Sequence, residues 1–234
     1  MIKKFMRFWS EEHALSVFLL LLVVYMFVIW PMVRTLPALG LASDLLFSIL
    51  LVAGALTLVQ YRTLQWITGM FVLLVIVVRW GGIIFGTPGL FFWNGVLSLL
   101  VTLAFLLIVL WWVYREGPVT GHRVRGAVAA YLLLAVCFSY AYALTESVHP
   151  GSFTLPPGGA EWTQTRSASF LYFSVVTLTT VGFGDIAAVH PVARSLVMVE
   201  ALVGALYPAI LLARIVTLQM ETRRSQKSRK DVGE

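Results

Sequence analysis

The stretch Thr177-Leu-Thr-Thr-Val-Gly-Phe-Gly-Asp185 combines hydroxyls, glycines and a carboxylate within an otherwise apolar part of the chain. It is poor material for a helix, because the glycines weaken a helix and because Thr and Val are β-branched. A buried loop at membrane depth would leave its carbonyls without hydrogen-bond donors. Both objections are met if the carbonyls face a central axis, where partly dehydrated cations replace the missing donors. The stretch therefore predicts an ion path lined by backbone carbonyls.

Each polar or flexible residue of this stretch has an expected role. Gly182 and Gly184 supply left-handed backbone conformations, which let consecutive carbonyls turn the same way. The hydroxyl of Thr180 adds the innermost ring of oxygens. Asp185 follows, where a ring of carboxylates would concentrate cations at the mouth of the path.

Residues Thr179-Thr-Val-Gly-Phe-Gly-Asp185 resemble the selectivity filter of the potassium channel family, with Phe at a position where Tyr is the commoner residue. The resemblance covers about residues 125–220, in the order helix, short pore helix, filter and helix. It implies that the conducted ion is K⁺. The residues that it implies as K⁺ ligands are Thr180, Val181, Gly182, Phe183 and Gly184.

One filter strand offers too few oxygens to replace the hydration shell of an ion. Four copies around an axis supply rings of four carbonyls, so we expect a fourfold homotetramer. Thr179, Tyr172 and Phe173 are expected to support the filter, the two aromatic residues by packing behind it. In several relatives a pore-helix carboxylate also holds the Asp after the filter, but its position here is Val176. That clamp is therefore absent.

The last apolar run carries three residues with expected roles. Glu200 near mid-membrane cannot face lipid cheaply as a charge, so we expect it to be protonated or bonded to pore-helix hydroxyls such as Ser174 or Thr177. A structural bridge is the favoured interpretation, and a proton-sensing gate is the alternative. Gly204 aligns with the hinge glycine of the family's inner helix, and Pro208 removes a backbone hydrogen bond one turn later. Close helix packing is the alternative role for both residues.

Composition identifies an integral membrane protein. Hydrophobic residues make up 59% of the 234 and charged residues 12%, about half the charged fraction of ordinary soluble chains. We predict an all-α fold with six transmembrane helices, each of about 20 residues. The predicted spans are 13–31, 42–60, 65–86, 90–113, 126–146 and 192–218. Residues 167–179 are too few to cross and are expected to form a re-entrant pore helix.

Basic residues set the predicted orientation. With a cytoplasmic N-terminus, most of the 17 Lys and Arg residues fall on the cytoplasmic side, and Arg34, Arg79, Arg166 and Arg194 remain for the outer half. We therefore expect a multi-pass protein of the plasma (inner) membrane with both termini cytoplasmic, and a prokaryotic origin from its compactness. The net charge of +6 then reflects basic segments near anionic lipid, and not a nucleic-acid partner.

The predicted spans divide the chain into four parts. Residues 1–115 form a four-helix peripheral domain, 116–125 a cytoplasmic linker, 126–220 the pore domain and 221–234 a basic cytoplasmic tail that could contact anionic lipid. This arrangement resembles six-span channels whose first four helices often sense voltage. Voltage sensing needs several charges, each worth about 2.3 kcal/mol per 100 mV, yet residues 90–114 contain no Arg or Lys. We therefore expect a scaffold and not a voltage sensor.

Arg79 is the one basic residue well inside an early span. Intramembrane charges are candidates for function. The favoured interpretation is that Arg79 extends to the outer interface, with Asp44 as a possible partner.

Together these features predict a potassium-selective channel that conducts K⁺ passively and is not voltage-gated. A weakly selective cation channel is one alternative, and a transporter subunit working by alternating access is another. An enzyme is not expected, because no metal-ligand cluster or nucleophile–base pair occurs in the sequence. No cofactor is expected other than K⁺ ions in the filter.

Overall fold

The computed structural model describes residues 14–29, 39–56, 62–85, 88–115, 121–154 and 164–232, and nearly all of them are helical. The elements, in chain order, are α2 (Ala14–Val24), the π-helix η2 (Tyr25–Ile29), α4 (Leu39–Leu56), α5 (Arg62–Phe85), α6 (Pro88–Tyr114), α7 (Gly121–Val148), β1 (Phe153–Thr154), α8 (Gln164–Leu178), β2 (Ala187–Ala188) and α9 (Pro191–Val232).

Helices are the expected outcome for apolar segments in a bilayer, because only a helix satisfies its own backbone groups there. Within the described residues, three helical stretches are long and apolar enough to cross a membrane, namely Phe92–Tyr114, Arg123–Val148 and Pro191–Arg214. Shorter apolar helical stretches also occur, among them Leu15–Ile29, Gly40–Ala55 and Thr68–Gly82. The structure is thus that of a mostly helical membrane protein, and the total of six spans stays a prediction.

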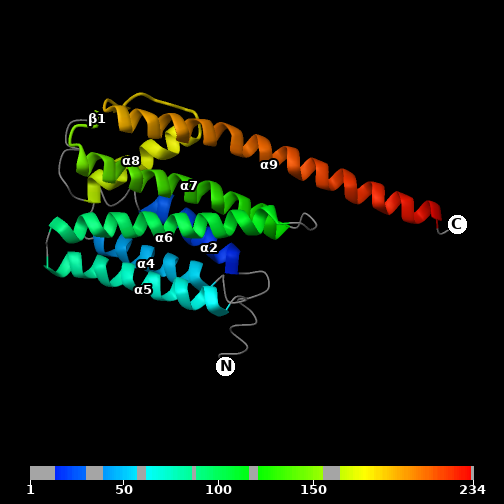
Figure 1. The fold of residues 1–234 in the computed structure, drawn as a ribbon, viewed down its shortest axis with the longest axis horizontal. Coiled ribbons are helices and arrows are strands. Elements are labelled where there is room, and N and C mark those ends of the chain that lie inside the picture. The colour runs from blue at the N-terminus through cyan, green and yellow to red at the C-terminus, as the bar shows by residue number, and fades with distance from the viewer. Residues whose placement is uncertain are drawn as a thin grey trace.

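The helix α7 lies at the centre of the arrangement (Figure 1). It packs against α2 and α6 on one side and against α8 and α9 on the other. The helices α4 and α5 form an outer layer, in which α5 packs against both α4 and α6. The first four helices therefore dock on the α7 of their own chain through α2 and α6.

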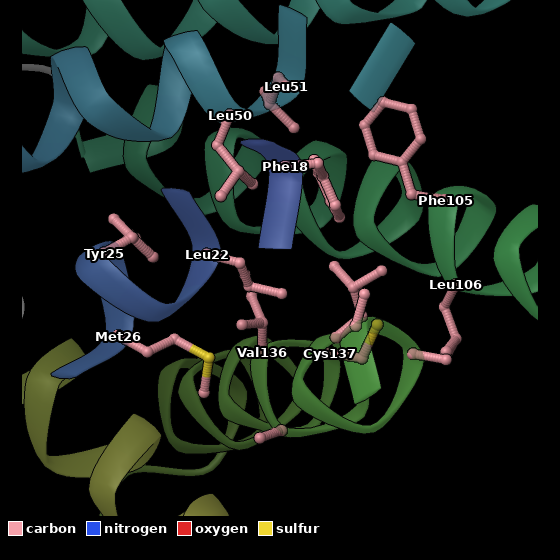
Figure 2. Packing of buried hydrophobic residues seen from close by; sticks show 14 of the residues in the cluster. Phe18, Leu22, Tyr25, Met26, Leu50, Leu51, Phe105, Leu106, Val136 and Cys137 are labelled. Atoms are coloured by element: carbon pink, nitrogen blue, oxygen red, sulfur yellow. The ribbon is translucent and has the colours of Figure 1, made fainter. Parts of the chain in front are cut away.

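Interlocking side chains fill the junction between these helices and α7 (Figure 2). Phe18 and Leu22 from α2 belong to the same buried cluster as Val136 and Cys137 from α7, and Leu22 lies toward Val136. The ring of Phe105 contributes from α6. Lipid is as apolar as these side chains, so van der Waals packing is the force that holds this junction together.

A buried ion pair lies inside the outer layer. The Nη2 atom of Arg79 on α5 is 2.5 Å from Oδ1 of Asp44 on α4, and its guanidinium lies over the ring of Phe47, 4.5 Å from the centroid. The predicted partner is confirmed. The predicted extension to the outer interface is wrong, because Arg79 is only 7% exposed and lies between the helices.

The helix α9 extends far beyond the other helices (Figure 1). Its 42 residues give a length of about 63 Å at 1.5 Å per residue, roughly twice the thickness of the hydrocarbon core. It continues through Pro208 and through most of the predicted tail. Likewise, α7 begins at Gly121, within the predicted linker.

Candidate functional site

The backbone of residues 180–184 alternates in handedness. Thr180, Gly182 and Gly184 have φ angles of 60°, 56° and 78°, whereas Val181 and Phe183 have none in the positive range. The left-handed conformations predicted for the two glycines are confirmed. The same conformation at Thr180 was not predicted, because a β-branched side chain is strained there by about 1–3 kcal/mol. This alternation gives successive carbonyls a common direction.

Hydrogen bonds hold one edge of this segment against the end of α8. The amide of Thr180 donates to the carbonyl of Thr177 at 2.9 Å, and the amide of Val181 donates to the carbonyl of Val176 at 3.0 Å. The amide of Gly182 shares the Val176 carbonyl at 3.3 Å. Across the described part of the chain, no donor is bonded to the carbonyls of residues 179–184. The segment therefore presents a row of free acceptors on its other edge.

The side chains around this row are open in the single chain. Val181 is 53% exposed and Phe183 is 69% exposed. Two such apolar side chains flanking a row of bare carbonyls form a surface that is suited to neither lipid nor water alone. The geometry fits a position where further chains complete the site.

Tyr172 and Phe173 were both predicted to support the segment, but they lie in different surroundings. Phe173 is buried, with its ring 5.2 Å from Tyr142 and 5.7 Å from Phe153. Tyr172 is 42% exposed, and its hydroxyl lies close to the carboxylate of Asp185. Phe173 thus packs among aromatic rings of α7 and β1, and Tyr172 lies close to Asp185, the residue after the segment. The packing of both rings behind the segment stays a prediction.

Glu200 links three helices at the back of the site. It is fully buried on α9, and its two carboxyl oxygens contact the hydroxyls of Tyr142 on α7 and Ser174 on α8. The predicted contact with Ser174 is found, and Thr177 is not a partner. Tyr142 was not predicted, although a tyrosine in an apolar helix usually has a buried partner for its hydroxyl.

A close contact between backbones fixes the last carbonyl of α8. A Cβ atom built on Gly204 would lie 2.0 Å from the carbonyl oxygen of Leu178. The same oxygen accepts a hydrogen bond from the hydroxyl of Tyr131 at 3.0 Å. The close packing considered for Gly204 is therefore present. The hinge at Gly204 and Pro208 stays a prediction, because α9 is continuous through both residues.

Replacing Gly204 by Ala should destabilise the protein by at least about 1–3 kcal/mol, because the new methyl group overlaps a backbone oxygen that cannot move freely. Gly69→Ala on α5 is the matched control, since no atom lies within 4 Å of its added Cβ. Thermal unfolding in detergent measures both. Equal midpoints for the two variants would contradict a fixed contact between α8 and α9.

A small antiparallel sheet anchors the chain that follows the segment. Phe153 pairs with Ala188 and Thr154 pairs with Ala187. The buried carboxylate of Glu146 accepts hydrogen bonds from the amides of Gly151 at 2.9 Å and Phe153 at 3.1 Å. The residues on both sides of the 180–184 segment are thereby held, one by α8 and the other by this sheet.

The comparison with known families agrees with this geometry. Residues 128–221 match a family model described as an ion channel. The matched range contains α8, the 180–184 segment and the first three-quarters of α9. It supports an ion channel domain in this part of the chain, and with it passive ion conduction in a membrane. No curated protein and no solved structure matches the chain.

Proposed function

We propose that this protein is a potassium-selective channel that conducts K⁺ passively across the plasma membrane. The observation that carries the proposal is the row of carbonyls at residues 179–184. The amides of residues 179–182 donate to carbonyls of α8, the φ angles of residues 180–184 alternate in sign, and no donor within the described residues occupies the carbonyls. Such a row replaces water around a cation. The resemblance of the sequence to potassium channel filters specifies K⁺.

The proposed channel is a homotetramer. A single chain offers one carbonyl at each level, whereas a ring of four is needed to replace a hydration shell. The apolar side chains exposed on the first half of α9 supply a surface for the neighbouring chains, among them Met198, Leu202, Leu206 and Ile210. Light scattering of the purified protein should give four times the chain mass of 26.0 kDa. A mass of one or two chains would contradict this assembly.

Two further groups favour a cation in the path. The C-terminal end of α8 lies at the base of the segment, where the helix dipole is negative. The carboxylate of Asp185 follows the last carbonyl and would form a negative ring in the tetramer. These two electrostatic effects attract any cation and do not distinguish K⁺ from Na⁺. In this proposal selectivity therefore rests on Thr180, Val181, Gly182, Phe183 and Gly184.

The first four helices act, in this proposal, as a scaffold and not as a voltage sensor. The helix α6 carries no Arg or Lys between Pro88 and Tyr114. The guanidinium of Arg79 is neutralised by Asp44 in its own layer, so the pair has no net charge to move in the field. The six spans, the two cytoplasmic termini and the contact of the basic tail with anionic lipid belong to the same proposal.

A flux experiment tests the conducted ion. Proteoliposomes loaded with K⁺ and diluted into Na⁺ medium that contains a protonophore should release K⁺, because protons entering through the protonophore balance the charge that leaves. Na⁺-loaded vesicles diluted into K⁺ medium with the same protonophore should release little Na⁺. Protein-free vesicles give the background, and a K⁺ ionophore gives the full release. Equal release of both ions would favour the weakly selective cation channel. Release that needs a second, coupled ion would favour the transporter.

A further inference from the structure

The contacts of Glu200 determine where its proton must be. The oxygen Oγ of Ser174 contacts two oxygens, Oε1 of Glu200 and the backbone carbonyl of Ala135, the latter at 2.8 Å. A serine hydroxyl has one proton to donate. A backbone carbonyl oxygen can only accept. The proton of Ser174 therefore goes to Ala135.

With its proton directed to Ala135, Ser174 cannot donate to Oε1 of Glu200. If Glu200 were a carboxylate, two acceptor oxygens would face one another in a buried site. A proton on Oε1 of Glu200 removes the conflict, because it donates to Oγ of Ser174. The other oxygen, Oε2, accepts from the hydroxyl of Tyr142. Every proton then has an acceptor, in a chain from Glu200 through Ser174 to the carbonyl of Ala135.

The surroundings of Glu200 agree with a neutral group. In the part of the chain that the structure describes, Glu200 forms no ion pair. Its titratable neighbours are two tyrosines of α7, Tyr142 in contact and Tyr131 farther away. An unpaired carboxylate at membrane depth is costly, whereas a hydrogen-bonded carboxylic acid is not.

We propose that Glu200 is held as a neutral carboxylic acid and that in this form it positions α8 behind the 180–184 segment. Ser174 lies one turn before Leu178, the residue that ends α8. Gly204, one turn after Glu200 on α9, contacts the carbonyl of that same Leu178. The helix α8 is thus attached to α9 at two successive turns. The effect on ion selection rests on the proposed function, but the protonation state does not.

If Glu200 is a neutral acid, a glutamine at this position can form the same hydrogen bonds. In Glu200→Gln, the side-chain NH₂ can donate to Ser174 and the side-chain carbonyl can accept from Tyr142, as the protonated acid does. Ser174→Ala removes the hydroxyl that joins Glu200 to Ala135, at little change in volume. The first variant should keep the attachment of α8, and the second should lose it.

Infrared difference spectroscopy of the protein in lipid tests the protonation state. The spectrum of the unmodified protein minus that of Glu200→Gln should contain the carbonyl band of a protonated carboxylic acid. Asp185→Asn is the matched control, because the side chain of Asp185 is exposed and its replacement should remove carboxylate bands instead. Loss of carboxylate bands in Glu200→Gln would overturn the proposal. This measurement needs no conduction, so its outcome is independent of the proposed function.

The positioning role is tested by the K⁺ and Na⁺ release described above. Glu200→Gln should keep the K⁺ to Na⁺ ratio of the unmodified protein. Ser174→Ala should lower the ratio by roughly tenfold, since a buried hydrogen-bonding group loses its partner. An equal loss in both variants, or an unchanged ratio in Ser174→Ala, would overturn the positioning role. Absence of K⁺ release from the unmodified protein would count against the proposed function and not against the infrared result.

Discussion

Replacing Gly184 by Ala should abolish the preference for K⁺ over Na⁺ while the protein remains folded. The φ angle of Gly184 is 78°, a left-handed conformation that costs an L-residue about 1–2 kcal/mol. When residue 184 carries a Cβ atom, its backbone relaxes out of this conformation. Its carbonyl then turns away from the direction that the neighbouring carbonyls share. Release of K⁺ and Na⁺ from proteoliposomes measures the change.

The chain offers a close control for the strain itself. Gly151 has a φ angle of 85° in the turn after α7, and, as at Gly184, no atom lies within 4 Å of an added Cβ. Gly151→Ala should therefore lower stability by a similar amount without changing the ion preference. If Gly151→Ala also lost selectivity, or if Gly184→Ala kept it, the carbonyl row would not be the selective element.

Removing one member of the Arg79–Asp44 pair should produce the largest loss of stability. Breaking a buried ion pair from one side costs about 3–5 kcal/mol, because the remaining charge has no partner. Asp44→Asn should be worse than Arg79→Gln, because a guanidinium cannot lose its proton in a protein whereas a carboxylate can gain one. Unfolding of the purified protein in detergent, followed by temperature, measures both variants.

The double variant Asp44→Asn with Arg79→Gln is the control for this pair. It removes both charges, so it should be more stable than Asp44→Asn alone, although it lacks the contact of the guanidinium with Phe47. Additive losses in the double variant would mean that the two residues act independently. That result would contradict the ion pair seen between α4 and α5.

The sequence allowed prediction of features governed by local backbone chemistry. The positive φ angles at Gly182 and Gly184 follow from the absence of a side chain, and a short helix before them follows from an apolar run too short to cross a bilayer. The positive φ at Thr180 could not be predicted in this way. It is imposed by hydrogen bonds to the end of α8, which oppose the intrinsic preference of the residue.

Contacts between distant helices were the part that the sequence left open. Glu200 required polar partners, and Ser174 was a reasonable candidate because both lie in the pore region. Tyr142 could not be selected, since nothing in the sequence says which face of α7 meets α9. The sequence suggested Asp44 as the partner of Arg79. It did not show that the two side chains are buried, because their burial depends on how α2, α4 and α5 pack around the pair.

Single-channel recording in a planar bilayer, with K⁺ on one side and Na⁺ on the other, tests the central claim most directly. A row of carbonyls that selects K⁺ predicts a reversal potential near the K⁺ equilibrium value. The neutral Arg79–Asp44 pair and the uncharged α6 predict an open probability that changes little with voltage. A reversal potential near zero would contradict potassium selectivity.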